Sequence, residues 1–276
     1  MAQPIDDLSQ LCIHTITTKP WDFATAVQKY SAAGVKGITI WRDAVEKLDL
    51  KMVKPMLDDH GLSLVSYCRG GFFPHTDAKK RQQAIEDNKR MIEEAAVIGA
   101  PMIVLVCGAN PGQSLETSRK QIREGIEAIL PTAVTNQVKL AIEPLHPMYA
   151  DTRSAVNTLA QANDMAEMID SVWVGVAVDV YHLWWDPVLK SEIMRCGRYE
   201  NLFAFHICDW NVPTTDLLLD RGLMGEGCIP VQEIRGWVEE AGFQGFNEVE
   251  IFSTKFWEGN QDEFLKKIIH AYRHHS

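Results

Sequence analysis

The sequence lacks the features that mark several large classes of protein. No stretch approaches the ~20 apolar residues that span a bilayer, so insertion into a membrane is not expected. The six cysteines form no Cys-x-x-Cys pair and lie mostly in or beside apolar runs, which favours reduced thiols. Basic charge is scarce, because 27 Lys and Arg face 37 Asp and Glu for a net charge of −10. Nucleic-acid binding is therefore not expected, since phosphate contacts require clusters of Lys and Arg.

Signals for export and for domain boundaries are missing as well. Residues 1–10 contain no basic segment followed by an apolar one, which a secretory signal would show, and we predict a cytoplasmic protein. No linker, low-complexity tract or block of charge interrupts the chain. Residues 1–276 are therefore expected to form one domain.

The chain does contain a regular alternation of short apolar runs and amphipathic segments. The apolar runs are rich in β-branched and aromatic residues and mostly continuous, which is typical of parallel strands covered on both faces. Several of the amphipathic segments end at a glycine, which suits the left-handed position after a helix. Three such glycines are Gly34, Gly61 and Gly99. The eight runs are residues 10–17, 35–42, 62–69, 101–108, 138–145, 172–180, 202–210 and 246–253.

Eight strand–helix units in one chain of this size predict an α/β fold, a single (β/α)₈ TIM barrel. A doubly wound open sheet is the main alternative, and it usually carries a glycine-rich turn after its first strand. The segment that follows the first run here, "HTITTKPWD", contains no glycine.

Polar residues gather where the last four predicted strands end, which is the end of a barrel that carries the chemistry. A single acidic residue there is more often exposed or paired in a salt bridge. Several on successive strands would converge on one mouth, and a buried carboxylate needs a partner or a cation. Lys139 is the only cationic side chain in these runs apart from the histidines, so the pattern favours a metal site. The candidates are Glu143, Asp179, His182, His206, Asp209, Glu248 and Glu250.

Carboxylate and imidazole donors without a thiolate suit several divalent cations. We expect one cation per chain, with Mn²⁺ as the first candidate and Mg²⁺, Co²⁺ and Zn²⁺ as alternatives.

Four motifs, "AIEPLHP", "VDVYH", "FHICDW" and "EVEIFS", together resemble the xylose isomerase-like TIM barrel superfamily. The resemblance is to its sugar phosphate isomerase/epimerase branch, which includes tagatose epimerases and inosose isomerases. It spans the whole chain and is most specific in the C-terminal half. It implies a metal held by Glu143, Asp179, His206 and Glu250, with His182 in contact with the substrate.

The chain departs from the ketose epimerases beyond the seventh strand. Val212 stands where those enzymes carry an arginine, and Arg221 is the candidate that takes over contact with the substrate. Trp184 and Trp185 would wall a sugar pocket, because sugars stack their C–H faces on aromatic rings. Packing beneath a helix is the alternative for both.

Further candidates end the first three strands. Trp41 and Arg42 would face the mouth and bind substrate, as would His14, for which a core position is the alternative. Arg42 and Arg69 would bind carboxylate, hydroxyl or phosphate groups through the guanidinium fork, or else form salt bridges at the rim.

The resemblance and the ligand set imply an isomerase or epimerase that acts on a small-molecule sugar, keto-sugar or cyclitol. Glu143 and Glu250 would exchange a proton next to a carbonyl group that the metal polarises. The alternative is a lyase or dehydratase for a 3-keto-sugar, glycoside or inosose. An abasic-site endonuclease would need more histidines, and a binding protein would not need all four ligands. A homo-oligomer is compatible with all of these functions.

Overall fold

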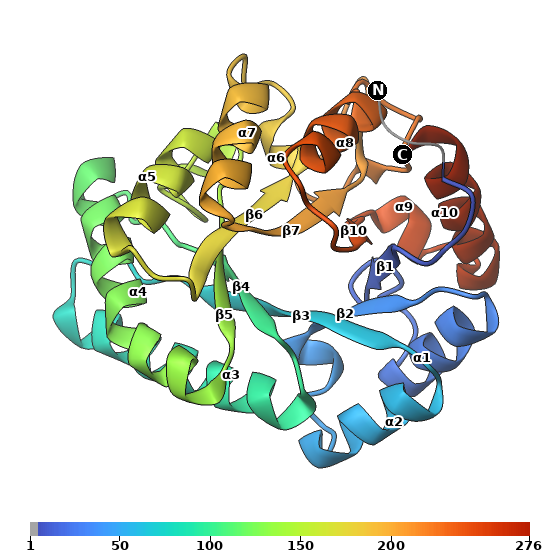
Figure 1. Cartoon of the computed structure of the whole chain (residues 1–276), viewed down its shortest axis with the longest axis horizontal. Helices are drawn as coiled ribbons and strands as arrows, with labels where there is room; N and C mark the ends of the chain where they lie inside the picture. Colours follow the sequence, from blue (N-terminus) through green and yellow to red (C-terminus); the bar gives the residue numbers. More distant parts are fainter. Residues whose placement is uncertain (1–4) are drawn as a thin grey trace.

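Eight parallel strands close into a barrel in the computed structural model, which describes residues 5–276 (Figure 1). Around the barrel the strands follow the order β1, β10, β7, β6, β5, β4, β3, β2. Each of the eight predicted runs coincides with one of these strands, with β3 reaching two residues beyond its run, which confirms the TIM barrel. The strands are β1 (Leu11–His14), β2 (Gly37–Trp41), β3 (Ser63–Gly71), β4 (Met102–Val106), β5 (Lys139–Glu143), β6 (Val174–Asp179), β7 (Leu202–Ile207) and β10 (Asn247–Val249).

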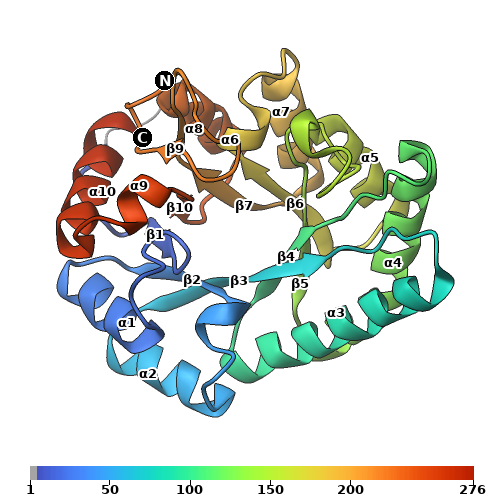
Figure 2. The ribbon, with the colours of Figure 1, turned by 180° about the vertical axis from the view of Figure 1, so that it is seen from behind.

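Helices form an outer ring around the strands, as seen from both sides of the molecule (Figures 1 and 2). The main helices are α1 (Phe23–Ala32), α2 (Val53–Asp59), α3 (Ala78–Ile98), α4 (Leu115–Asn136), α5 (Leu159–Ile169), α7 (Leu189–Tyr199), α8 (Val231–Glu240) and α10 (Gln261–His275). The short elements are η1 (Arg42–Ala44), η2 (Leu50–Met52), η3 (Pro147–Tyr149), α6 (Val180–Leu183), α9 (Thr254–Trp257), β8 (Asp209–Trp210) and β9 (Arg221–Gly222).

The ends of these helices follow from local residues. A polar side chain before the first turn accepts a hydrogen bond from a free backbone N–H, and such caps stabilise helix starts. The capping residues are Asp22, Asp77, Ser114, Thr158 and Asn260. The three predicted glycines after helices all adopt a positive φ, of 83° at Gly34, 63° at Gly61 and 80° at Gly99. The sequence therefore predicted these boundaries correctly.

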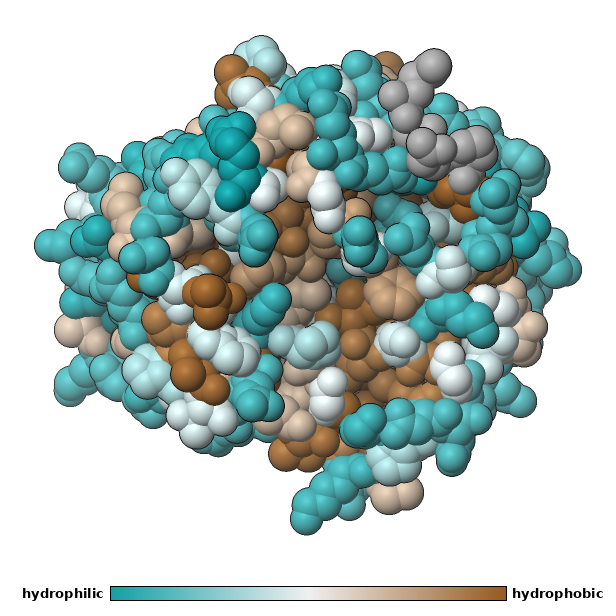
Figure 3. Space-filling view, in the orientation of Figure 1, coloured by the Kyte–Doolittle hydropathy of each residue, from teal (hydrophilic) through white to brown (hydrophobic). Residues whose placement is uncertain are grey.

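The core has an outer and an inner layer. Isoleucine, leucine and valine on the outer side of the strands pack against the helices. Inside the barrel the side chains are smaller, with Ala141, Ala177 and Ala204 fully buried beside Cys12 and Val104. Figure 3 shows apolar residues gathered near the middle of one face, inside a ring of hydrophilic ones.

The predicted domain covers residues 1–276, and residues 1–4 of it lie outside the described part of the chain. All six cysteines are free thiols in the structure, and five are buried. No helix among residues 5–276 has the length and apolarity required to cross a bilayer.

Candidate metal centre and active site

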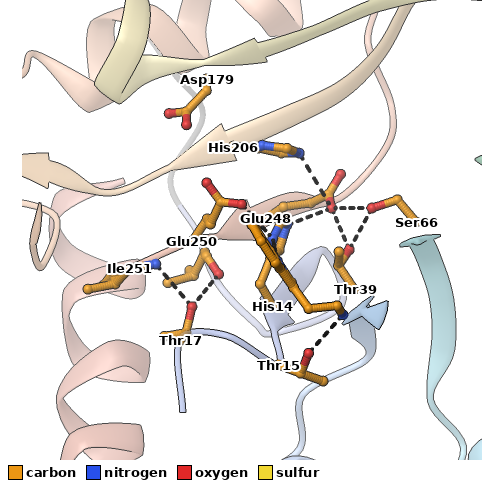
Figure 4. A network of polar contacts seen from close by, with 12 residues as sticks. His14, Thr15, Thr17, Thr39, Ser66, Asp179, His206, Glu248, Glu250 and Ile251 are labelled. Carbon is orange, nitrogen blue, oxygen red and sulfur yellow. Dashed lines mark hydrogen bonds and ion pairs between the residues drawn. The ribbon is translucent and has the colours of Figure 1, made fainter. Parts of the chain in front are cut away.

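The four predicted ligands meet at one end of the barrel. One donor atom from each of Glu143, Asp179, His206 and Glu250 lies within 4.8 Å of the other three, and all four residues are buried. In Figure 4 the side chains of Asp179, His206 and Glu250 come from neighbouring strands and lie around one space. Residues up to 107 positions apart in the chain thus form one compact set of three carboxylates and one imidazole.

The two-residue period of β-strands explains this convergence. Successive side chains point to opposite faces of a strand, so the residue two positions after an inward one also points inward. Three of the predicted ligands follow a buried interior alanine in this way, and the parallel register places Asp179 directly beside His206. The pairs are Ala141 and Glu143, Ala177 and Asp179, and Ala204 and His206.

The contact between Glu143 and His206 has the geometry of two ligands that share an ion. Glu143 Oε1 lies 2.9 Å from His206 Nδ1, yet neither buried atom has a hydrogen-bond partner among the described residues. Metal–ligand bonds of about 2.0–2.2 Å place neighbouring ligand atoms roughly 3 Å apart. The two buried atoms form an ion pair but no hydrogen bond, and buried polar atoms without a hydrogen bond are costly unless a ligand satisfies them. The donors therefore fit a divalent cation.

Arg221 is a buried cation that sequence reasoning did not place in this set. Its Nη1 lies 3.1 Å from Asp179 Oδ2 and 2.8 Å from Glu250 Oε2, so it pairs with two of the ligands. It reaches them from β9. This residue lies outside the last four predicted strands, and the prediction considered cationic partners only within those strands. One guanidinium balances one charge, and the other carboxylates still require a cation.

A second group of polar side chains lies next to the predicted ligands and contacts Glu250. Glu248 Oε2 accepts hydrogen bonds from Thr39, at 2.6 Å, and Ser66, at 3.3 Å, and lies 3.0 Å from His14 Nε2 (Figure 4). The other nitrogen of His14, Nδ1, lies 3.1 Å from Glu250 Oε1. His14 is fully buried, and it contacts the carboxylates rather than lining the pockets described below. The structure favours the core position that was the alternative for His14.

The carboxylates hold protons strongly on the histidines between them. Burial alone would lower the pKa of His206, but the negative charges of Glu248 and Glu143 outweigh it and raise that pKa to about 10. Burial raises the pKa of the Asp179 carboxyl to about 6, against the opposing charge of Arg221. A metal binds deprotonated ligands, so a cation would take the place of such protons.

The ligands open onto a narrow cavity, here called the mouth pocket. Its walls include the predicted residues Trp41, His182 and Arg221. The complete lining is Trp41, Cys68, Arg69, Val104, Val106, Glu143, Leu145, Tyr149, Arg153, His182, Leu218, Arg221, Glu250 and Phe252. A wider outer pocket of about 740 Å³ adjoins it and shares Trp41, Cys68, Arg69 and Phe252 with it.

The two tryptophans after β6 do not line either pocket. Trp184 packs against Trp210 with ring centroids 5.9 Å apart, and Trp185 packs against His146 at 5.6 Å. The structure therefore favours packing, which was the alternative for both tryptophans, because the residues after α6 direct both rings into an aromatic cluster. Trp41 and Phe252, at 5.1 Å, form the aromatic wall instead.

Arg42 lies at the rim of the outer pocket, where its guanidinium is engaged by helix α3. It donates to Glu94 at 2.7 and 2.8 Å and to Asp87 at 3.1 and 3.2 Å. These contacts correspond to the salt bridge at the rim that was one of its two predicted roles. Among the described residues, Arg69 by contrast forms no ion pair.

The family model described as xylose isomerase-like TIM barrel matches residues 27–271. The chain belongs to this family. An inosose isomerase of Bacillus velezensis is 24% identical over 249 residues, which cover 81% of this chain and 84% of that protein. The crystal structure of a Sinorhizobium meliloti protein has a TM-score of 0.94 and 46% identity and covers 98% of this chain and 99% of its own.

A further similar structure is that of IOLI protein with a bound zinc atom. It has a TM-score of 0.83 and 20% identity, and the match covers 95% of this chain and 96% of that one. At this level of identity the likeness shows the shared barrel.

Proposed function

We propose that this protein is a divalent-metal-dependent isomerase or epimerase of sugars, keto-sugars or cyclitols. The observation that carries the proposal is the buried set of Glu143, Asp179, His206 and Glu250, with donor atoms within 4.8 Å of one another. The similarity to an inosose isomerase supports the substrate class, and the zinc in the IOLI structure supports a cation. The outer pocket of about 740 Å³, which adjoins the mouth pocket, provides room for a small-molecule substrate. Homo-oligomerisation, cytoplasmic location and the absence of nucleic-acid binding stay predictions.

Oxygen and nitrogen donors without a thiolate suit Mn²⁺, Mg²⁺, Co²⁺ or Zn²⁺, and we keep Mn²⁺ as the first candidate. When bound, such a cation supplies Lewis-acid polarisation of a substrate carbonyl, which acidifies the neighbouring C–H. The residues of the chain then move the proton. Glu143 ends β5 and Glu250 follows β10, so the two carboxylates approach the substrate from different strands. One would remove the proton and the other would return it to the same or the neighbouring carbon.

His182 offers the substrate a hydrogen-bond donor. Its Nε2 lies 3.2 Å from Arg221 Nη2, and a guanidinium can only donate, so Nε2 accepts. Burial and the charge of Arg221 lower the pKa of His182, which keeps the ring neutral and its proton on Nδ1. That buried Nδ1 has no partner among the described residues, and His182 lines the mouth pocket. A substrate oxygen would satisfy it.

Replacing His182 with alanine is expected to retain the metal and to lower kcat or raise KM by about tenfold or more, because one buried hydrogen bond to substrate is lost. Metal content and steady-state kinetics measure this. His60→Ala is the matched control, since His60 bonds to Met56 O at the end of α2. Loss of the metal in His182→Ala would mean that His182 is itself a ligand.

Solvent exchange tests the proposed chemistry. The protein is incubated in D₂O with a panel of ketoses, inosose and 3-keto-sugars, and we expect deuterium on carbon in at least one compound. An isomerase or epimerase labels the rearranged sugar, whereas elimination yields an unsaturated or dehydrated product and would assign the lyase. Turnover of the true substrate by the metal-loaded protein without solvent exchange would contradict proton abstraction.

A further inference from the structure

Two arginines at the mouth pocket have no acidic partner. Arg69, near the end of β3, and Arg153, on the loop after β5, both line this pocket and are half-buried. Neither guanidinium takes part in an ion pair or a hydrogen bond among the described residues. The third arginine of the pocket, Arg221, is paired with Asp179 and Glu250, and Arg42 at the rim is paired with Glu94 and Asp87. Arg69 and Arg153 thus have no paired carboxylate where substrate would enter.

Aromatic rings hold both guanidinium groups in place. The Arg69 guanidinium carbon lies 4.7 Å from the ring centroid of Phe72 and 5.6 Å from that of Trp41. Arg153 lies 5.6 Å from the ring of Tyr149, whose hydroxyl donates to Leu217 O at 2.6 Å. Stacking on a ring face leaves the in-plane N–H groups of an arginine free to donate. The rings therefore fix the two groups before any ligand arrives, which lowers the entropic cost of binding.

The positive charges of Arg69 and Arg153 also repel each other. Burial, followed by the charge of Arg153, lowers the pKa of the Arg69 guanidinium. Glu143 and Glu250 attract Arg69, but these carboxylates belong to the metal set. A divalent cation together with Arg221 would balance three of the four buried carboxylates Glu143, Asp179, Glu248 and Glu250. Arg69 and Arg153 would then leave the mouth with net positive charge, which a negatively charged ligand would neutralise.

We propose that Arg69 and Arg153 bind an oxyanion group of the substrate, a carboxylate or a phosphate, so that the substrate is an anionic keto-sugar. This inference rests on the proposed function and narrows its substrate class. Arginine binds both oxyanions through forked pairs of N–H donors. The adjoining outer pocket, which Arg69 also lines, provides room for the larger phosphate.

Matched sets of ligands test the inference. One set is D-fructose, D-fructuronate and D-fructose 6-phosphate, which differ only in a hydroxyl, a carboxylate or a phosphate at the sixth carbon. The tagatose series forms a second set. Dissociation constants are measured with the metal-loaded protein by calorimetry. At least one anionic member is expected to bind tenfold to a hundredfold more tightly than its neutral counterpart, and the preferred member distinguishes carboxylate from phosphate.

Arginine-to-methionine variants assign the effect to the two residues. Arg69→Met and Arg153→Met should each remove most of the anionic preference, while affinity for the neutral sugar stays within a few-fold of wild type. Arg198→Met is the control, because Arg198 is exposed in the last turn of α7, at the opposite end of the barrel. It should keep the full preference.

Equal binding of neutral and anionic members, no detectable binding of any member, or a preference that survives both substitutions would overturn the inference. The proposed function would fail separately, through a lack of metal-dependent solvent exchange with any sugar. Exchange into a neutral sugar without an anionic preference would keep the proposed function and reject the anionic substrate.

Discussion

Glu143→Gln and Glu250→Gln should each lower turnover by about 10²–10⁴-fold, the usual contribution of a general acid or base. Glutamine keeps the shape of the side chain and a carbonyl oxygen, but it cannot accept a proton at neutral pH. Both carboxylates are buried and line the mouth pocket, where the proposed function requires the substrate to lie. Initial rates on the substrate found by solvent exchange, with metal content determined for each variant, measure the effect.

The control for this pair is Glu124→Gln on helix α4, where Glu124 is exposed and lies 3.8 Å from Lys120. It should leave turnover unchanged. If Glu143→Gln keeps its metal and turns over at the wild-type rate, Glu143 is a ligand without a role in proton transfer. The same reasoning holds for Glu250.

Replacing Arg221 with methionine should destabilise the protein by about 3–5 kcal/mol in the presence of chelator, because two buried carboxylates lose their cationic partner. Arg221 is 2% exposed and Asp179 is fully buried, so water cannot compensate. Denaturant unfolding gives the free energy. Added divalent cation should restore part of the loss, since the cation would neutralise the same carboxylates.

Arg195→Met provides the matched comparison, because Arg195 also contacts carboxylates, at 2.6 Å in Glu167 and 2.8 Å in Asp164. Those contacts are partly exposed, and we expect the substitution to lower the free energy of unfolding by about 1 kcal/mol. Equal losses in the two variants would show that the burial of Arg221 does not matter. If Arg221→Met cannot be purified, Arg221→Lys, which keeps a positive charge, should fold.

Much of the barrel and of the ligand set was predictable because both follow from periodic features of the chain. Continuous apolar runs predicted the eight strands, and glycines predicted helix ends such as Gly34 and Gly99. The fold then directs the ends of parallel strands to one mouth. Strand period and parallel topology together therefore explain why Asp179 and His206, 27 residues apart in sequence, lie side by side in register.

The rest of the site depends on side chains outside the eight barrel strands, whose positions near the mouth follow from no strand period. Arg221 reaches Asp179 across 42 residues, and Arg42 is captured by Glu94 of α3 across 52. Arg153 comes from the loop after β5 without a recognisable motif. Its position near the mouth depends on how that loop folds back, which local sequence does not specify.

Metal content tests the four-ligand centre most directly. The wild-type protein, purified without chelator from metal-replete medium, should contain one divalent ion per chain by elemental analysis. His206→Ala and Glu250→Gln should contain much less, His60→Ala should match wild type, and affinity should fall in acid as ligands take up protons. A folded wild-type protein that binds no divalent ion when divalent cations are supplied in excess would contradict the metal centre and the function proposed from it.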